Sequence, residues 1–538
     1  MQAFDYVIVG AGAAGCLLAH RLCEDGRYTV CVLEAGPSDS HPYLHIPAGF
    51  IKVGHDPRYT WDFSTEPAEG SAGRRVVTRM GRTLGGSSAI NGFNYTRGQA
   101  QDYDQWAALG HHGWSYREVL PYFRRTERRI GAHDPSLRGS DGLLPITDCD
   151  WRHPLCDAFI EAASHELDIP PHADYNRGQQ TGAGYYQRWI HQGRRISAAT
   201  AFLRPAQATG RLYVKTHAHV TKILFEGKRA VGVDYQRERG GPVLTVRARR
   251  ELILSAGAGN TPKILQLSGV GPAELLQQVG VRVVHAMEAV GENFQDHYMV
   301  RTILRVKGVT TLNHSTRGMR LLGEIFKWAL GKPSVLAISP SVAYAFTKSR
   351  PEATLDDLQF HFSPGSYASG VAGQLDDFPG MTLGYYQLRP TSVGYVRLLS
   401  RDPFELPAVQ PNYLQSEQDR RVAVDALRLA RRILHSAPFQ KYIERDEFPP
   451  PSATTDDELL DCARQRGTTS WHFVGSCSMG KVVDAELRVK GLEGVRVVDA
   501  SVMPTMPSGN TGAPTMMIAE KAADMILGRS PLPAACIR

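Results

Sequence analysis

Apolar residues near the start of the chain form two short runs, 4–9 and 28–33. Between them lie a glycine-rich segment at 10–15 (Gly-Ala-Gly-Ala-Ala-Gly) and a stretch of helical periodicity that closes near Gly26. The second run ends at Glu34. This order predicts a strand, a tight turn, a helix and a second strand, which together are the first unit of a doubly wound dinucleotide-binding fold.

The small and acidic positions of this unit each have a mechanical explanation. Gly10 permits the tight turn, Gly12 lets a pyrophosphate approach the backbone, and Gly15 lets helix and strand pack closely. The phosphates are expected at the helix N-terminus, where backbone N–H groups are free. Glu34 can accept hydrogen bonds from an adenosine ribose and would repel a 2′-phosphate, which argues against NADP. The unit alone does not distinguish FAD from NAD.

Later apolar runs predict the remaining elements. Five short strands are expected at 212–216, 220–225, 230–235, 243–246 and 252–255, and another at 494–498. Residues 300–464 alternate β-rich stretches with a helix at 417–436, which predicts a mostly antiparallel sheet with flanking helices. The expected fold class is α/β: a Rossmann-type nucleotide-binding domain with a discontinuous α+β cap for the substrate.

Length and charge limit the function classes. A chain of 538 residues is too long for one core, so two or more domains are expected. The formal charge of +7, from 61 basic and 54 acidic residues, is too small to indicate nucleic acid as a partner. The densest basic run, at 124–129, is interpreted as a solvated helix face.

The cysteines and the apolar runs bear on compartment and metal binding. Eight cysteines without CxxC or Cys/His zinc spacing predict reduced thiols, and no metal site is expected. No apolar run approaches the roughly 18–20 residues of a membrane span, and strand residues begin almost at the N-terminus, leaving no room for a signal peptide. We expect a cytoplasmic protein without an integral membrane segment, and peripheral membrane contact stays open.

A second glycine-rich segment, 85–91 (Gly-Gly-Ser-Ser-Ala-Ile-Asn), followed by Tyr-Thr-Arg-Gly at 95–98, resembles the first signature of the glucose–methanol–choline (GMC) flavin oxidoreductases. Small residues and free N–H groups suit a cradle for a flavin or its pyrophosphate, although a Gly-Ser surface turn would read similarly. The resemblance spans nearly the whole chain and is weakest in about 300–460. Further agreement lies at 61–62, 102–106, 120–123, 255–272, 290–297 and 471–524.

The resemblance implies FAD as the cofactor. Some family members attach the flavin to a histidine just before the asparagine of the first signature; here that residue is Ile90, which implies non-covalent binding. Val220 is expected near the adenine. The expected cofactor-binding residues are Gly10, Gly12, Ala13, Ala14, Gly15, Glu34, Ala35, Trp61, Gly85, Gly86, Ser87, Asn91, Gly92, Phe93, Asn94, Val220, Ala256, Gly257, Trp471, Asp499, Ala500, Asn510 and Thr511.

The resemblance also implies a domain order that alternates along the chain. FAD-binding segments are expected at 1–155, 195–299 and 465–538, and substrate-binding segments at 156–194 and 300–464. The last FAD-binding segment would carry the catalytic pair.

In the family, the catalytic histidine falls at His472 and its partner, histidine or asparagine, at Asn510. Taken alone, His472 would more often be a satisfied core residue, and Asn510 a turn or N-cap residue before a helix that starts near Pro514. As a pair they suit alcohol oxidation. His472 would take the hydroxyl proton while hydride leaves for flavin N5, and the Asn510 amide would hold the developing alkoxide. The N-terminus of the following helix would stabilise the reduced flavin.

Substrate contacts are expected from Phe93, Trp471, His472 and Asn510, with a primary alcohol as substrate and choline as a possibility. Further aromatic residues suggest the pocket lining, although such residues are more often core: Phe360, Phe362, Tyr385 and Tyr386. The electron acceptor is expected to be a quinone or another carrier. An oxidase that uses O2 and releases H2O2 is the alternative, which Ser470 disfavours because several family oxidases carry an apolar residue there. A flavin-containing lyase, and more remotely a light-driven decarboxylase, are further alternatives.

Overall fold

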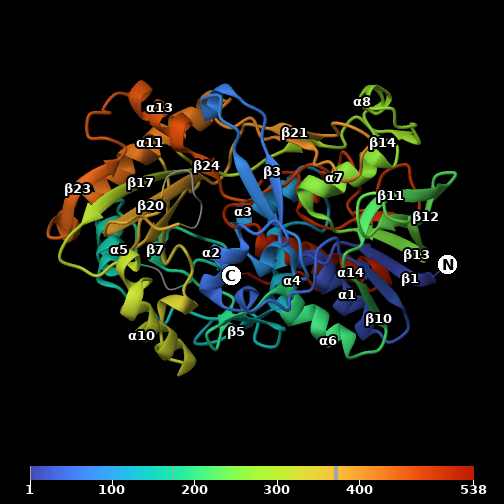
Figure 1. The fold of residues 1–538 in the computed structure, drawn as a ribbon, viewed down its shortest axis with the longest axis horizontal. Helices are drawn as coiled ribbons and strands as arrows, with labels where there is room; N and C mark the ends of the chain where they lie inside the picture. The colour runs from blue at the N-terminus through green and yellow to red at the C-terminus, as the bar shows by residue number, and fades with distance from the viewer. Residues whose placement is uncertain (1, 172–173, 369–373, 538) are drawn as a thin grey trace.

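The computed structural model describes residues 2–171, 174–368 and 374–537. The chain opens with β1 (Gln2–Val9), α1 (Ala13–Glu24) and β2 (Val30–Leu33), as the apolar pattern predicts. β1 lies between β2 and β13 (Leu244–Leu254) and is parallel to both. The parallel sheet continues through β10 (Leu212–Lys215) beside β2 and β25 (Val495–Val497) beside β13. Figure 1 shows this sheet in the right half of the molecule.

One detail of the predicted strands is corrected. The strands expected at 243–246 and 252–255 form the single strand β13. The strand expected at 212–216, β10, belongs to the parallel part of the sheet. β11 (His219–Glu226) and β12 (Arg229–Gln236) run antiparallel and join the sheet through β13.

A second sheet forms the left half of Figure 1. Its strand order is β23–β17–β20–β19–β18–β7, and every pairing is antiparallel. The bounds are Ile443–Phe448, Tyr298–Val306, Gly380–Gln387, Leu358–Ser363, Ala343–Thr347 and Gly182–Tyr185, and β24 (Thr468–Thr469) also pairs with β17. One face packs against α5 (Pro154–Glu166), α11 (Glu417–Leu434) and α13 (Asp456–Arg466) around an apolar core. The predicted α/β fold class with its antiparallel cap is confirmed.

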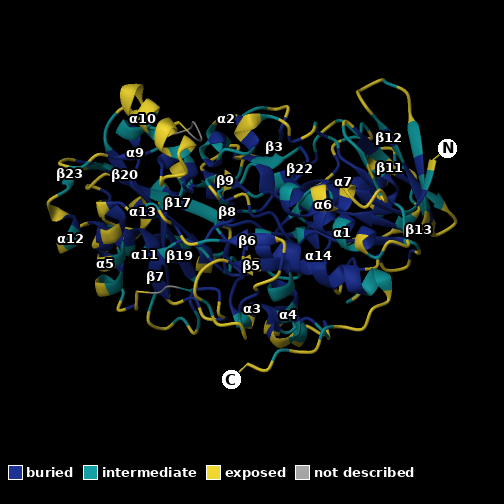
Figure 2. Cartoon of the chain, turned by 90° about the horizontal axis from the view of Figure 1, so that it is seen from below, coloured by how far each residue is buried: buried dark blue, intermediate teal, exposed yellow. Residues whose placement is uncertain are grey.

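α1 packs beside α14 (Gly512–Leu527), so helices from the early and late parts of the chain lie together at the parallel sheet (Figure 1). Figure 2 shows buried residues concentrated along both sheets, whereas α10 (Gly318–Ala329) is largely exposed. The other helices are α2 (Phe50–Val53), α3 (Ala100–Ala108), α4 (Tyr116–Thr126), α6 (Arg204–Gln207), α7 (Gly257–Leu267), α8 (Ala273–Gln278), α9 (Leu312–Ser315) and α12 (Ala437–Gln440). The other strands are β3 (Thr60–Ser64), β4 (Val77–Gly81), β5 (Glu127–Arg129), β6 (Leu144–Ile146), β8 (Ile190–His191), β9 (Arg194–Arg195), β14 (Val270–Gly271), β15 (His285–Ala286), β16 (Glu292–Phe294), β21 (Gly394–Arg397) and β22 (Ala408–Gln410).

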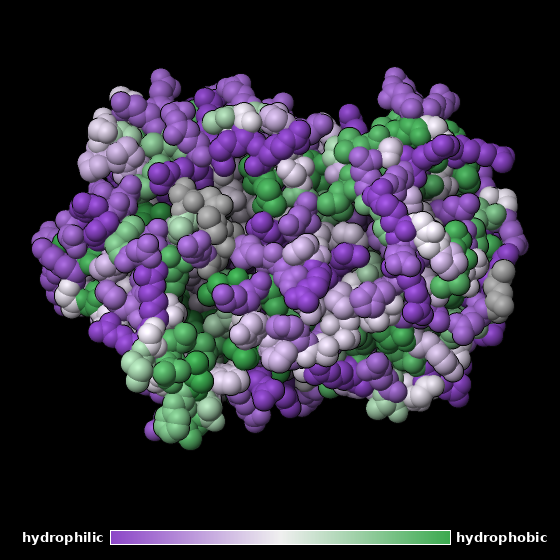
Figure 3. Space-filling model, in the orientation of Figure 1, coloured by the Kyte–Doolittle hydropathy of each residue, from purple (hydrophilic) through white to green (hydrophobic). Residues whose placement is uncertain are grey.

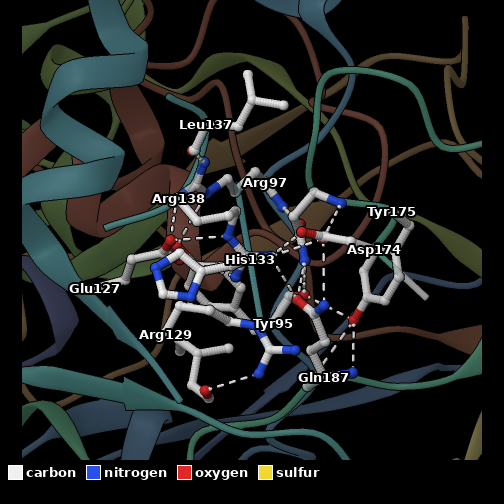
Figure 4. Close-up of polar contacts among 12 residues, drawn as sticks. Tyr95, Arg97, Glu127, Arg129, His133, Leu137, Arg138, Asp174, Tyr175 and Gln187 are labelled. Carbon is white, nitrogen blue, oxygen red and sulfur yellow. Dashed lines mark hydrogen bonds and ion pairs between the residues drawn. The ribbon is translucent and has the colours of Figure 1, made fainter. Parts of the chain in front are cut away.

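A buried ion network joins segments that are far apart in the sequence (Figure 4). Arg138 donates to Glu127 at 2.8 Å and to Asp174 at 2.7 Å, and Arg97 pairs with Glu127 at 2.6 Å. Burial opposes ionisation of Glu127, but Arg97 and Arg138 lower its pKa to about 2. The carboxylate is therefore charged, and the network fixes the chain that follows the 85–91 segment.

The prediction of a solvated helix face at 124–129 is wrong. α4 ends at Thr126, and residues 127–129 form β5, where Glu127 and Arg129 are buried. Charges this deep are tolerated because each has a partner of opposite sign, Arg97 and Arg138 for Glu127 and Asp148 for Arg129.

In the described part of the chain, no helix combines the length and apolar character needed to cross a lipid bilayer. The same residues contain no group of three or more His, Cys, Asp or Glu side chains that could hold a metal ion.

Candidate active site

The glycine turn after β1 is shaped by close backbone contacts. Gly10 has a φ of 101°, and a Cβ placed there would lie 2.4 Å from the carbonyl oxygen of Ser255. A Cβ at Gly15 would lie 2.0 Å from the carbonyl oxygen of Gly10, so any side chain would push helix and turn apart. A Cβ at Gly12 would lie 3.9 Å from its nearest neighbour, the Ser255 carbonyl oxygen, so there is free space beside the backbone at this position. That room is what a pyrophosphate at the α1 N-terminus requires.

The 85–91 segment lies directly against this turn. The Gly85 N–H donates to the Ala11 carbonyl at 2.8 Å, and a Cβ at Gly86 would lie 2.6 Å from the Gly12 Cα. The turn and the predicted cradle therefore form one glycine-lined surface, which fits the phosphates and ring edge of a dinucleotide.

Glu34 ends β2 beside this surface. It is buried, and its two carboxylate oxygens accept the N–H groups of Ala11 (2.9 Å) and Gly36 (2.8 Å). Burial raises its pKa to about 7, although both hydrogen bonds oppose that shift. Each oxygen accepts one N–H and keeps a second lone pair, so Glu34 retains capacity to accept further hydrogen bonds.

One cavity of about 410 Å³ runs from the glycine turn to the cap sheet. Of the residues expected at the site, those that line it are Gly10, Gly12, Ala13, Ala14, Glu34, Ala35, Trp61, Gly86, Ser87, Asn91, Gly92, Phe93, Asn94, Val220, Ala256, Gly257, Trp471, His472, Asp499, Ala500, Asn510 and Thr511. Gly15 and Gly85 do not; they shape the turn and the cradle from behind.

His472 and Asn510 meet in this cavity. His472 Nε2 lies 3.1 Å from Asn510 Nδ2, and Asn510 Oδ1 accepts a hydrogen bond from the Thr96 hydroxyl at 3.1 Å. The Thr96 contact orients the Asn510 amide so that its NH2 group faces His472. Asn510 does not cap the following helix, because α14 begins at Gly512 with Thr511 in the N-cap position.

Buried polar contacts hold both partners in place. The Asp296 carboxylate accepts the backbone N–H of His472 at 2.8 Å and the Thr469 hydroxyl at 2.5 Å. On the other side, the residues flanking Thr96 are tied to Asn176. Its amide donates to the Tyr95 carbonyl at 3.0 Å and accepts the Arg97 N–H at 2.7 Å.

A chain of hydrogen bonds selects the tautomer of His472. His297 Nε2 lies 3.0 Å from the Leu388 carbonyl, which can only accept, so this nitrogen carries the proton. His297 Nδ1 therefore has a lone pair and accepts from His472 Nδ1 at 2.9 Å. With its proton on Nδ1, neutral His472 presents a lone pair on Nε2 toward Asn510. Burial, with His297 and His361 nearby, holds the pKa of His472 well below its usual range, so the imidazole is neutral.

We expect His297→Phe to lower kcat/KM about 10- to 100-fold, because the ring can still stack on Tyr386 (4.4 Å between centroids) but cannot accept the His472 Nδ1 proton. In the wild type, kcat/KM should stay constant as pH falls through 6.5, since the lowered pKa keeps His472 unprotonated. In the variant this acid limb should move to higher pH, because His297 no longer depresses that pKa. His297→Gln, which offers an amide oxygen as acceptor, should recover part of the loss. A Phe variant with wild-type rate and pH profile would contradict the tautomer assignment.

Alternate residues of three cap strands form the opposite cavity wall. Met299 and Arg301 of β17, His361 and Ser363 of β19, and Thr382, Gly384 and Tyr386 of β20 all line the cavity. The intervening residues Phe360, Phe362 and Tyr385 lie in the core on the other face of the sheet. The suggested aromatic pocket is therefore only partly correct, because it keeps Phe93, Trp471 and Tyr386.

Two predicted site residues have a left-handed backbone: φ is 66° at Phe93 and 62° at Trp471. Bulky residues rarely adopt this conformation, and such strain is typical of functional sites. Trp471 is 37% exposed, which places it at the solvent side of the cavity.

The N-terminus of α14 also faces the cavity. Thr511, Gly512 and Thr515 line it, the first turn has no acidic residue, and no side chain caps it. The free N–H groups at this end of a 16-residue helix favour negative charge. The predicted start near Pro514 is two residues late, because glycine at 512 fits against the Trp189 ring, which a Cβ would approach to 2.7 Å.

Three residues on or next to the cap strands were not predicted as functional candidates: His297, Arg301 and His361. His297 closes the 290–297 segment that carries part of the resemblance, so a role for it could have been suspected. Arg301 and His361 come together only through strand register, which a single sequence does not reveal.

Comparisons with known proteins identify the family of this chain. The GMC oxidoreductase N-terminal and C-terminal family profiles match residues 4–299 and 390–519. The chain is 37% identical to an alcohol dehydrogenase [acceptor] of Pseudomonas putida, over 97% of this chain and 96% of that one. It is 39% identical to an oxygen-dependent choline dehydrogenase of Photobacterium profundum, with 98% and 94% covered. The structure of pyridoxine 4-oxidase from Mesorbium loti superposes with a TM-score of 0.87 at 30% identity, covering 98% of this chain and 99% of that chain. The chain therefore belongs to the GMC oxidoreductases, a family of FAD-binding flavoproteins, and is an alcohol- or choline-dehydrogenase-like member of it.

Proposed function

We propose that this protein oxidises a primary alcohol to the aldehyde, with His472 as general base and Asn510 as the group that orients the alcohol oxygen. The observation that carries the proposal is the neutral imidazole of His472, whose unprotonated Nε2 lies 3.1 Å from the Asn510 amide inside the cavity. An alcohol oxygen that contacts both groups can give its O–H proton to Nε2 and accept a hydrogen bond from Asn510.

Residues on both sides of the cavity fit FAD, which supplies the hydride acceptor when bound. Gly12, Gly86 and Glu34 would hold its pyrophosphate and ribose, and the α14 N-terminus would face the part that becomes negative. Ile90 lines the cavity and has no group able to bond to a flavin, so we infer non-covalent binding.

The chain's own contribution is proton handling and orientation. As hydride leaves the carbon, His472 takes the hydroxyl proton and becomes a cation while its Nδ1–H stays bound to His297. The Asn510 amide then donates to the oxygen as its negative charge grows. Thr96 and Asp296 hold Asn510 and His472 in a fixed relative position, which lowers the entropic part of the activation barrier.

The test is anaerobic addition of primary alcohols to the purified holoenzyme. We expect loss of the oxidised flavin absorbance, and absence of bleaching with every alcohol would favour the flavin-containing lyase instead. Admission of air then identifies the acceptor. We propose a quinone or another carrier, as the name of the alcohol dehydrogenase [acceptor] relative and Ser470 favour, so reoxidation should be slow in air and fast with a quinone. Rapid reoxidation of the flavin in air, with release of H2O2, would support the oxidase alternative instead.

We also propose a cytoplasmic protein that contacts membranes reversibly through α10. The helix and its C-cap residue expose five large apolar side chains, and Figure 3 shows a green patch at the lower left, where Figure 1 places α10. They are Met319 (80%), Leu322 (57%), Ile325 (42%), Phe326 (67%) and Leu330 (55%). Residues 317–332 include four cationic side chains and one acidic one, which favours an anionic lipid surface over a second protein copy.

Vesicle sedimentation checks this contact. The holoenzyme should pellet with phosphatidylglycerol vesicles and much less with phosphatidylcholine. The double variant Leu322→Ser/Phe326→Ser should lose this binding, while Leu399→Ser, which removes an equally exposed leucine elsewhere, should keep it. A dimer in solution that dissociates in the double variant would show that a second copy covers the face instead.

A further inference from the structure

One cation on the cavity wall lacks a partner. Arg301 of β17 is half-buried and lines the cavity, yet its guanidinium forms no hydrogen bond or ion pair with any residue that the structure describes. Arg305, four residues further along and on the same face of the strand, pairs with Glu447 at 2.9 Å. Burial lowers the pKa of Arg301, but a guanidinium stays charged in proteins. A charge removed from water without a counter-charge is costly, so the site favours an anion.

Strand register places His361 beside this cation. Arg301 pairs with Gly384, and Gly384 pairs with His361, so both side chains stand on the same rung of the sheet with a glycine between them. Gly384 has no side chain, and Met299 packs over it: a Cβ there would lie 3.2 Å from Met299 Sδ. Arg301 and His361 line the cavity on either side of this glycine.

Hydrogen bonds on the cavity face of the sheet fix the tautomer of His361. The Gln359 amide oxygen accepts from Tyr386, so its NH2 group donates to the Tyr186 oxygen at 2.7 Å. Tyr186 must then give its own proton to His361 Nδ1, at 2.8 Å. The remaining His361 proton sits on Nε2, which is buried without a partner, as is the Thr382 hydroxyl two residues from Gly384.

No acidic residue offsets these groups among the described residues that line the cavity near them. The two acids of the cavity, Glu34 and Asp499, lie at the nucleotide end, where each accepts backbone N–H groups. The cap wall thus combines one unpaired cation with two unsatisfied polar groups, and an anionic group on a ligand would satisfy all three.

We propose that Arg301, His361 and Thr382 form an anion subsite that binds the carboxylate of a hydroxy acid, whose alcohol end reaches His472. The placement of the alcohol group at His472 rests on the proposed function, whereas the anion subsite does not depend on it. One ring separates the two ends, since Tyr386 lies 4.9 Å from His361 and 5.6 Å from His472 between ring centroids. A compact substrate of about the length of a substituted benzyl alcohol therefore fits. A quaternary ammonium alcohol such as choline would meet Arg301 with like charge and is disfavoured.

Three benzyl alcohols that differ only in the para group test the subsite: carboxylate, methyl and trimethylammonium. With a dye acceptor, wild-type kcat/KM should be highest for the carboxylate. Arg301→Gln should lower it about 10- to 100-fold for the carboxylate, mainly through KM, because a charge-assisted bidentate contact is lost. The methyl compound should change less than about threefold, and the trimethylammonium compound should improve. Arg301→Lys should recover part of the carboxylate rate, and Arg305→Gln should match the wild type.

A binding measurement separates this inference from the proposed function. Benzoate has no alcohol, so its affinity for the holoenzyme can be read from the flavin spectrum without turnover. We expect Arg301→Gln to weaken benzoate binding at least about tenfold at unchanged flavin content. If no alcohol is oxidised but benzoate binding still depends on Arg301, the proposed function fails and the subsite stands. Equal rates for the three alcohols, together with benzoate affinity that is unchanged in Arg301→Gln, would overturn the subsite.

Discussion

Replacement of His472 by alanine is expected to lower kcat about 10²- to 10⁴-fold, the usual contribution of a general base. The variant loses the imidazole that contacts Asn510 and, with it, the proposed acceptor of the alcohol proton. Flavin content should not change, because the glycine turn and Glu34 lie at the other end of the cavity. Single-turnover reduction of the flavin by an alcohol measures the effect directly.

The control is His472→Gln, which keeps a polar side chain of similar length but cannot take a proton at neutral pH. It should be as slow as the alanine variant if the base is what matters, and faster if packing is what matters. Added imidazole should partly restore reduction in His472→Ala, because it can enter the space left by the ring. Activity of His472→Ala within about tenfold of wild type would contradict the general-base role.

Gly10→Ala should abolish cofactor binding and destabilise the fold by more than about 2 kcal/mol. The added Cβ would meet the Ser255 carbonyl at 2.4 Å, and that oxygen belongs to the backbone just after β13, where it cannot turn away. The φ of 101° adds conformational strain for any L side chain. Flavin per protein in the purified variant and the urea midpoint of the apoprotein measure the two effects.

Gly26→Ala is the matched control within the same strand–helix–strand unit. Its φ of 75° is also positive, but a Cβ there would meet no atom within 4 Å. It should therefore cost only about 1 kcal/mol and keep its flavin. Equal behaviour of the two variants would show that backbone conformation alone, rather than contact with the β13 end, makes Gly10 necessary.

The first strand–helix–strand unit could be predicted because its information is local. Glycine spacing, helical periodicity and the terminal Glu34 all lie within 34 residues. β13 was predicted as two strands because its middle, Arg249-Arg250, is charged and exposed. There the strand passes between two partners on the same edge, pairing with β12 through residues 244–247 and with β25 through residues 252–254. The local polarity suggested a turn, although β13 continues and only its pairing partner changes.

The prediction for the charged residues at 127–129 was wrong for a related reason. Glu127 reads as a surface residue, but Arg97 and Arg138 neutralise it from other parts of the chain. In the site, His472 and Asn510 were found through family resemblance, whereas Arg301 and His361 share a rung only after β17, β20 and β19 pair. Pairing register depends on the whole fold, so a single sequence gives no direct signal of it.

The order in which the nucleotide-binding sheet takes up its strands has a consequence for biosynthesis. β1 and β2 leave the ribosome first, whereas β25 and Asn510 leave among the last 44 residues of 538. Until then the edge of β13 at residues 252–254 has no partner, and the proposed catalytic pair is incomplete. We therefore expect cofactor loading to follow synthesis of β25 and Asn510. A product that ends prematurely leaves an open strand edge, which invites aggregation rather than partial activity.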